Sequence, residues 1–257
     1  MQTLFETAHA QVDAFSATQW SVILAAGESQ ADPESSRAAL AALCQTYWPP
    51  LYTYARARGH SVPDAQDLTQ GFFAYLLEHK IYKRADREKG KFRSFLLASF
   101  KNFLADAWDR ERAQKRGGGR DFVTFDESRA AAAESLFHSH HPAGESGFAQ
   151  DRLFERTWAE TLVGTALARV AAAYKGEAKE TLFEHLKGFL IVGAAPLPSY
   201  ADLATRLGLA ESTLRSQVTR LRARYREILR AEVRRTVDTD IEVDSELREL
   251  LRVLSNA

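Results

Sequence analysis

Apolar side chains recur every three or four residues along most of this chain, which is the spacing of an amphipathic helix. The spacing runs from about Trp20 to Trp108 and resumes near Asp151, from where it continues towards the C-terminus. No alternation of apolar and polar residues is long enough to predict a strand. The pattern therefore predicts an all-α fold.

A glycine-rich break separates the two helical blocks. Residues 115–120 hold three consecutive glycines between basic side chains, and no sustained helical spacing follows until about Gly147. This stretch also contains a run of four alanines and a histidine-rich segment, so we expect a flexible linker whose only structure is a helical turn. The predicted layout is two helical domains at 15–116 and 151–235, a linker at 117–150 and a C-terminal extension at 236–257.

Two helices joined by a short turn are predicted within the second block. Ser199-Tyr200-Ala201-Asp202 has the S-x-x-D form of a capping box. Gly208 tolerates the positive φ of a tight turn, and an amphipathic helix follows it through Leu214, Val218 and Leu221. This pattern is typical of a helix-turn-helix, whose second helix enters the DNA major groove, although a plain pair of surface helices is the alternative.

The outward positions of that second helix carry side chains suited to DNA. Arg can contact guanine through two hydrogen bonds, and Ser or Thr can contact bases or phosphates. Further along the same helix, contact with the DNA backbone is expected from Arg222, Arg224, Arg226 and Arg230. The predicted base-reading and phosphate-holding residues are Ser212, Thr213, Arg215, Ser216, Thr219 and Arg220.

Charge is unevenly distributed in this chain of 257 residues, whose formal net charge is +0. Between Lys80 and Arg120 there are thirteen Lys or Arg and five Asp or Glu, and between Glu211 and Arg235 there are eight Arg and three Glu. The tail from Asp238 onward has six acids and two Arg. Two basic segments in a neutral chain indicate a nucleic-acid partner, with affinity that falls steeply as salt rises.

Composition narrows the class of protein further. Cys44 is the only cysteine, which excludes an internal disulfide and fits a small buried apolar residue in a reducing compartment. The first seven residues lack a basic segment followed by an apolar one, and no apolar run is long enough to span a bilayer. We therefore expect a cytoplasmic protein without membrane insertion and without a cofactor.

Two segments of the first block have polar side chains in patterns that core packing alone does not explain. After Pro63, Asp64 is placed to cap a helix that shows acidic and amide side chains opposite an apolar stripe. A second helix is expected from Phe92 to Arg110, where basic residues alternate with aromatic ones. Such a surface can hold the backbone of a single strand while its bases stack.

The three segments together resemble the extracytoplasmic-function group of the sigma-70 family of RNA polymerase sigma factors. Residues 64–73 are similar to the family's D-A-E-D-L-V-Q-E-T-F helix, and residues 92–110 to its helix for melting and recognising the downstream promoter element. Residues 199–224 are similar to its second DNA-binding domain, which reads the upstream element. The match covers most of residues 15–235, and residues 59–73 and 114–119 look like a large subgroup found in Planctomycetes.

The resemblance implies a sigma factor rather than an enzyme. Its region 2 domain would bind core RNA polymerase and the downstream element, its region 4 domain would bind the upstream element, and an anti-sigma factor or a kinase-linked regulator would be a further partner. By position, the residues that make or support the polymerase contact would be Asp64, Asp67, Leu68, Gln70 and Phe73. Those that contact the downstream element would be Lys91, Arg93, Lys101, Asn102, Arg110 and Arg112.

Two positions depart from the family pattern. Gly71 stands where Glu is common, which costs the helix about 1 kcal/mol relative to Ala and removes a charge from the docking surface. Ala210 stands at the expected N-cap of the second helix of the helix-turn-helix, where Ser or Thr is usual and is typically worth about 1 kcal/mol.

Two other functions compete with this interpretation. A helix-turn-helix regulator that does not bind polymerase would explain the C-terminal arginines, but not the basic, aromatic-rich segment from Phe92 to Arg120. A metal-dependent hydrolase could use His138, His140 and His141, but no carboxylate pattern completes a site. The C-terminal extension carries Leu247, Leu250, Leu251 and Leu254 at helical spacing, which indicates a packed helix or one that docks on a regulator or on the DNA-binding helix.

Overall fold

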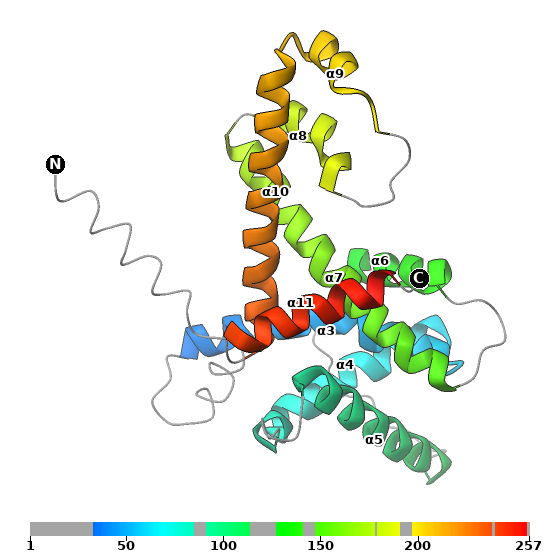
Figure 1. Ribbon diagram of the computed structural model, residues 1–257. Coiled ribbons are helices and arrows are strands. Elements are labelled where there is room, and N and C mark those ends of the chain that lie inside the picture. The colour runs from blue at the N-terminus through cyan, green and yellow to red at the C-terminus, as the bar shows by residue number, and fades with distance from the viewer. Residues whose placement is uncertain are drawn as a thin grey trace, which may run out of the picture. The chain divides into compact units, whose positions relative to one another are not determined.

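The computed structural model describes residues 33–84, 91–113, 127–140, 147–177, 179–190, 197–237 and 240–255 (Figure 1). All regular secondary structure in these ranges is helical, which confirms the predicted all-α class. The chain divides into two compact units: unit 2 is Leu162–Val233, and unit 1 combines the residues up to Thr161 with those from Arg234 onward. No helix in the described ranges has the length and apolarity needed to cross a membrane.

Unit 1 contains the helices α3 (Pro33–Ala57), α4 (Val62–Glu78), α5 (Phe92–Ala113), α6 (Glu127–His140) and α11 (Asp240–Ser255), together with the short 3₁₀ helix η1 (Ile81–Arg84). The first part of α7 (Gly147–Gly176) also belongs to it. The sequence pattern assigned this part of α7 to the second domain, but its side chains Phe154 and Trp158 are fully buried in unit 1.

Aromatic rings fill the core of unit 1. Phe72 of α4 makes edge-to-face contacts with Phe100 and Phe103 of α5, with ring centroids 5.0 and 5.6 Å apart. Trp48 and Tyr52 stack on each other within α3 at 5.0 Å. Each such pair adds about 0.5–1.5 kcal/mol beyond the burial of apolar area. This packing fixes α4 and α5, the two helices with the candidate polymerase and DNA residues of this unit.

Helix α4 begins earlier than the sequence pattern indicates. Its N-cap is Ser61, whose hydroxyl accepts a hydrogen bond from the Asp64 amide at 3.2 Å. Asp64 lies inside the first turn, where its carboxylate accepts from the Ser61 hydroxyl at 2.5 Å. The prediction that Asp64 caps this helix was wrong, because Pro63 was placed outside the helix. Proline fits the first turn, where the backbone N–H groups have no partner within the helix.

Helix α6 lies in the segment that was predicted to be a linker with a single helical turn. Its Ala133 and Phe137 are buried, and Glu134 accepts hydrogen bonds from both Arg56 nitrogens Nε and Nη2 at 2.9 and 2.8 Å. The Tyr52 hydroxyl donates to the same carboxylate at 2.5 Å. The helix is therefore attached to α3 by a charged, two-point contact as well as by apolar packing.

Replacing Glu134 by Gln is expected to lower the free energy of unfolding by about 2 kcal/mol at neutral pH, because the charged pair with Arg56 is lost. The hydrogen bond from Arg56 lowers the pKa of Glu134 below its ordinary value of 4.5, despite partial burial. Since the folded-state pKa is the lower one, this stabilisation is complete above the unfolded-state value and is lost as pH falls through the folded-state value.

Urea unfolding of both proteins at pH 7 and at roughly pH 3 measures this effect. The stability difference between wild type and Glu134→Gln should shrink at the lower pH. Ser135→Ala is the control, because Ser135 is exposed and its hydroxyl donates only to the Ala131 carbonyl of its own helix. A Glu134→Gln protein as stable as wild type at pH 7 would show that the contact adds nothing.

The last helix, α11, packs by a different face from the one the leucine spacing predicted. Val243, Glu246 and Leu250 are buried at 0, 2 and 0% exposure, whereas Leu251 is 60% exposed. Leu247 and Leu254 are half-buried. The helix therefore packs in unit 1, which was one of the two expectations for this segment. Its buried face has a carboxylate in the middle.

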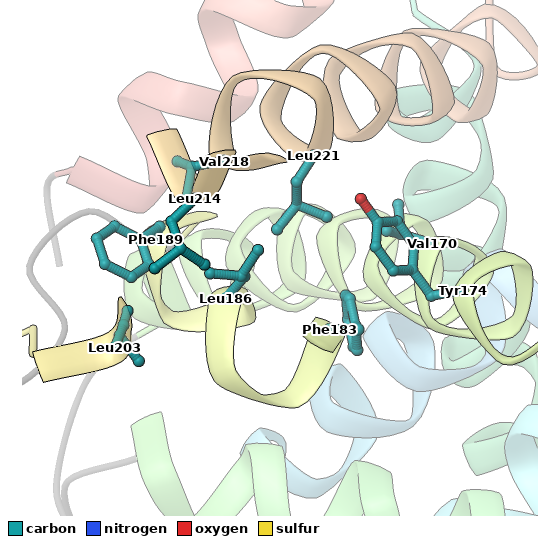
Figure 2. Close-up of a cluster of buried hydrophobic side chains, with 9 residues drawn as sticks. All are labelled: Val170, Tyr174, Phe183, Leu186, Phe189, Leu203, Leu214, Val218 and Leu221. Carbon is teal, nitrogen blue, oxygen red and sulfur yellow. The ribbon is translucent and has the colours of Figure 1, made fainter. Parts of the chain in front are cut away.

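A cluster of nine buried side chains joins the helices of unit 2 (Figure 2). They come from the end of α7 and from α8 (Glu180–Leu186), the 3₁₀ helix η3 (Lys187–Leu190), α9 (Tyr200–Leu207) and α10 (Glu211–Arg234). Helices as short as α8 and α9 are marginal in water on their own, so this cluster is what holds them. The nine residues are Val170, Tyr174, Phe183, Leu186, Phe189, Leu203, Leu214, Val218 and Leu221.

Candidate nucleic-acid interface

The turn between α9 and α10 has the geometry that its sequence predicted. The Ser199 hydroxyl accepts from the Asp202 amide at 3.1 Å, which confirms Ser199 as the N-cap, and it donates to the Asp202 carboxylate at 2.7 Å. Gly208 ends α9 with φ 64° and ψ 30°, a left-handed conformation that strains other residues. The Leu214 amide donates to the Ala210 carbonyl at 3.1 Å, so α10 starts from an uncapped alanine.

Helix α10 has one buried face and one polar face. Leu214, Val218 and Leu221 point into the cluster of unit 2 (Figure 2) and are at most 1% exposed. Leu203 of α9 packs in the same cluster, so both helices are held by it. The six predicted base-reading and phosphate-holding residues of α10 are exposed: Ser212, Thr213, Arg215, Ser216, Thr219 and Arg220.

Arg215 is partly ordered before any partner binds. Its guanidinium lies 4.5 Å from the centroid of the Tyr200 ring and 3.3 Å from a carboxylate oxygen of Glu211. The side chain remains 61% exposed. A long side chain that is already held loses less conformational entropy when it binds, so Arg215 is the best-prepared cation on this face.

Two of the arginines expected to contact the DNA backbone also make contacts inside unit 2. Arg222 donates to the Phe189 carbonyl at 3.2 Å, and Arg224 donates to Glu177 at 2.6 Å. The hydrogen bond from Arg224, followed by that from Lys179, lowers the pKa of Glu177. These side chains therefore help attach α10 to the rest of its unit, while Arg226 is exposed.

The candidate polymerase residues of α4 divide into exposed and buried ones. Asp64 and Asp67 are exposed, whereas Leu68 and Gln70 are half-buried. Phe73 is only 2% exposed and packs in the core. A partner could therefore contact the two carboxylates directly, and Phe73 would act by supporting the helix.

At the start of α5 the structure brings Lys91 and Arg93 together around one carboxylate. Arg93 is 4% exposed and forms an ion pair with Glu246 of α11, while its Nε donates to Glu155 of α7 at 2.6 Å. The Lys91 Nζ lies 3.1 Å from the other Glu246 oxygen. Arg93 is therefore not free to contact a phosphate in this conformation, contrary to the exposed position that its predicted role requires.

Charge and aromatic contact both stabilise the cationic form of Arg93. Burial disfavours the charged guanidinium, but Glu155 and Glu246 outweigh this cost and raise its pKa. The guanidinium also lies 4.2 Å from the centroid of the buried Trp158 ring, a cation–π distance. This cluster was missed because its acids lie 62 and 153 positions away along the chain.

The other predicted contacts of α5 are spread along the helix. Lys101 pairs with Asp151 of α7 at 2.7 Å and is partly exposed, and Asn102 is exposed. Arg110 and Arg112 lie in α5, but their side chains are outside the described residues, as is the basic, glycine-rich segment 114–126. Among the side chains of this set that the structure describes, Lys91 and Arg93 are the ones brought together at one carboxylate.

The histidines of the alternative metal site do not converge on carboxylates in the described ranges. His138 is exposed on α6, with its Nε2 3.1 Å from Glu134. The side chain of His140 and all of His141 lie outside the described residues. Where the structure describes the side chains, no group of three or more His, Cys, Asp or Glu is placed to hold a metal ion.

Comparison of the chain with protein-family models, with curated proteins and with solved structures found no match. Function is therefore inferred from three surfaces of this molecule: the polar face of α10, the acidic face of α4 and the start of α5. The cysteine contributes no further site, since Cys44 is buried and burial raises the pKa of its thiol to about 12.

Proposed function

We propose that this chain is a sigma factor, which binds core RNA polymerase and directs transcription from specific promoters. In this proposal α9, the turn at Gly208 and α10 form a helix-turn-helix that reads the upstream promoter element. The observation that carries the proposal is the polar face of α10, where six side chains suited to DNA are exposed directly above a fully buried apolar face.

In this proposal some side chains of α10 read the base sequence and others attach the helix to the DNA backbone. Arg215, held over Tyr200 near the N-terminal end of α10, is suited to a base edge, where a two-point contact is worth about 1–3 kcal/mol of discrimination. The hydroxyls of Ser212 and Thr213 lie in the first turn and are suited to bases or phosphates. Arg220 lies further along, where contact with the backbone is the expected role.

Promoter opening would be a binding equilibrium with no covalent step on this chain. Unpairing and unstacking a base costs a few kcal/mol, and a basic surface with aromatic side chains can offset part of it by holding the released strand. Helix α5 would supply the polar part of such a surface, with Lys91 at its start and Lys101 and Asn102 along it, while its Phe100 and Phe103 rings pack against Phe72 in unit 1. The acidic face of α4 would hold the polymerase, so that both DNA-binding surfaces act on one promoter.

Replacing Asp67 by Arg is expected to weaken binding to bacterial core RNA polymerase by roughly tenfold or more, since reversing one charge at a complementary interface places like charges together. Asp67 is exposed on α4, so the substitution should leave the fold intact. Binding can be measured with immobilised core enzyme, and circular dichroism verifies folding.

The matched control is Glu184→Arg, which reverses an exposed carboxylate of α8 in the other unit. This variant should bind core enzyme like wild type. Binding of duplex DNA by the wild-type chain without any binding to core enzyme would instead favour a helix-turn-helix regulator.

A further inference from the structure

Helix α11 delivers a carboxylate to two cations of the proposed downstream-element surface. Glu246 is 2% exposed, and its two oxygens contact Lys91 and Arg93 separately. A carboxylate bound between a lysine and an arginine has the same chemistry as a phosphate bound by the same pair. Glu246 therefore occupies the position that a DNA phosphate needs in order to reach Lys91 and Arg93.

The contacts around Arg93 allow another anion to replace Glu246. Arg93 has a second partner in Glu155, and its guanidinium also lies over the Trp158 ring. Removing Glu246 therefore leaves Arg93 paired and leaves Lys91, which is 40% exposed, open to another anion. If Arg93 had no other partner, loss of Glu246 would leave a buried charge uncompensated, which would be very costly.

The remainder of α11 is only partly covered. Ile241 is 84% exposed and Leu251 is 60% exposed, whereas Val243 and Leu250 are buried beside Glu246. The tail that contains this helix has six acids and two Arg, so its net charge matches that of a nucleic acid in sign. The helix thus combines a modest apolar contact with an acidic side chain placed on two cations.

We propose that α11 is an internal competitor of promoter DNA: while it is docked, Glu246 blocks Lys91 and Arg93, and the DNA must displace it to bind them. This inference rests on the proposed function, because it takes the start of α5 as a DNA-binding surface. The two ligands exclude each other, so any change that weakens the α11 contact strengthens DNA binding, by up to the same factor while the docked state dominates.

The test compares three full-length proteins: wild type, Glu246→Gln and Glu242→Gln. Glu242 is an exposed residue of the same helix, and the second variant makes the same change in charge. Binding to a fluorescent single-stranded oligonucleotide of mixed sequence is followed by anisotropy at low salt. Glu246→Gln is expected to bind on the order of tenfold more tightly than wild type, and Glu242→Gln like wild type.

Equal affinity of wild type and Glu246→Gln, or no binding by any of the three proteins, overturns the proposal. Hydrogen exchange on the wild-type chain provides a second measurement that needs no variant. The oligonucleotide should accelerate exchange of the amides in residues 240–255, whereas a helix with a purely structural role would exchange at the same rate with and without DNA.

Binding of the same three proteins to core RNA polymerase separates this proposal from the sigma assignment. Polymerase binding by all three with equal DNA affinities rejects the role of α11 and leaves the sigma assignment in place. Tighter DNA binding by Glu246→Gln without polymerase binding supports the role of α11 and rejects the sigma assignment.

Discussion

Replacing both Arg215 and Arg220 by Ala is expected to weaken binding to duplex DNA on the order of a hundredfold. Both side chains are exposed on the polar face of α10, and neither belongs to the buried cluster below it. A good arginine contact with a base or phosphate is worth about 1–3 kcal/mol, so two together account for a loss of this size. The fold should be unaffected, because the exposed positions leave no cavity.

The measurement uses a duplex selected by the wild-type chain from a random-sequence library, titrated over a range of salt concentrations. The slope of log affinity against log salt should also become shallower by about one for each lost phosphate contact. Arg58→Ala with Arg152→Ala is the control, since both arginines are exposed in unit 1 and the charge change is the same. Equal weakening by both double variants would mean that net charge, and not this face of α10, binds the DNA.

Replacing Leu214 by Ala is expected to destabilise unit 2 by about 2–5 kcal/mol, the usual cost of emptying a buried leucine site. Leu214 is 0% exposed and lies in the cluster that joins α8, η3, α9 and α10 (Figure 2). The loss is large for a unit of this size, because small domains are stabilised by only 5–15 kcal/mol in total. Affinity for DNA should fall with stability, since the polar face of α10 depends on this anchor.

Leu209→Ala makes the same chemical change a few residues earlier, at a turn position that is 37% exposed. It should cost clearly less than Leu214→Ala, because more than a third of that side chain is already in water. Urea unfolding of the two variants, followed by circular dichroism, compares them directly. Similar losses of stability in both would mean that the cluster does not hold α10 in the way described.

Features that depend on neighbours in the sequence could be predicted from the sequence. The N-cap at Ser199 and the left-handed turn at Gly208 each follow from local rules about backbone hydrogen bonds and φ angles. The burial of Leu214, Val218 and Leu221 follows from helical spacing alone. For the same reason, the exposed face of α10 was identified residue by residue.

The sequence predicted only a helical turn where α6 forms, because this segment has little helical periodicity. A run of alanines has high helix propensity but no contrast between an apolar and a polar face. Its attachment depends on Glu134, whose partners Tyr52 and Arg56 lie about 80 positions earlier. Contacts at such a distance along the chain leave no mark in the local sequence pattern.

The role of Arg93 could not be foreseen for a related reason. Arginine is rarely buried unless paired, so an arginine on an amphipathic helix is expected to face water. Its burial requires Glu155, Glu246 and the Trp158 ring together, and these come from α7 and α11. The same rule predicted an exposed polar face correctly on α10, where no distant acid lies over Arg215.

The order in which the chain is synthesised determines which parts of unit 1 can fold first. This unit is interrupted in sequence by unit 2 and includes residues from both sides of it. Protein synthesis proceeds from the N-terminus and domains begin to fold as they emerge, so the early helices of unit 1 form before α11 exists. On the ribosome, Lys91 and Arg93 are without Glu246 until the segment that contains α11 has been made.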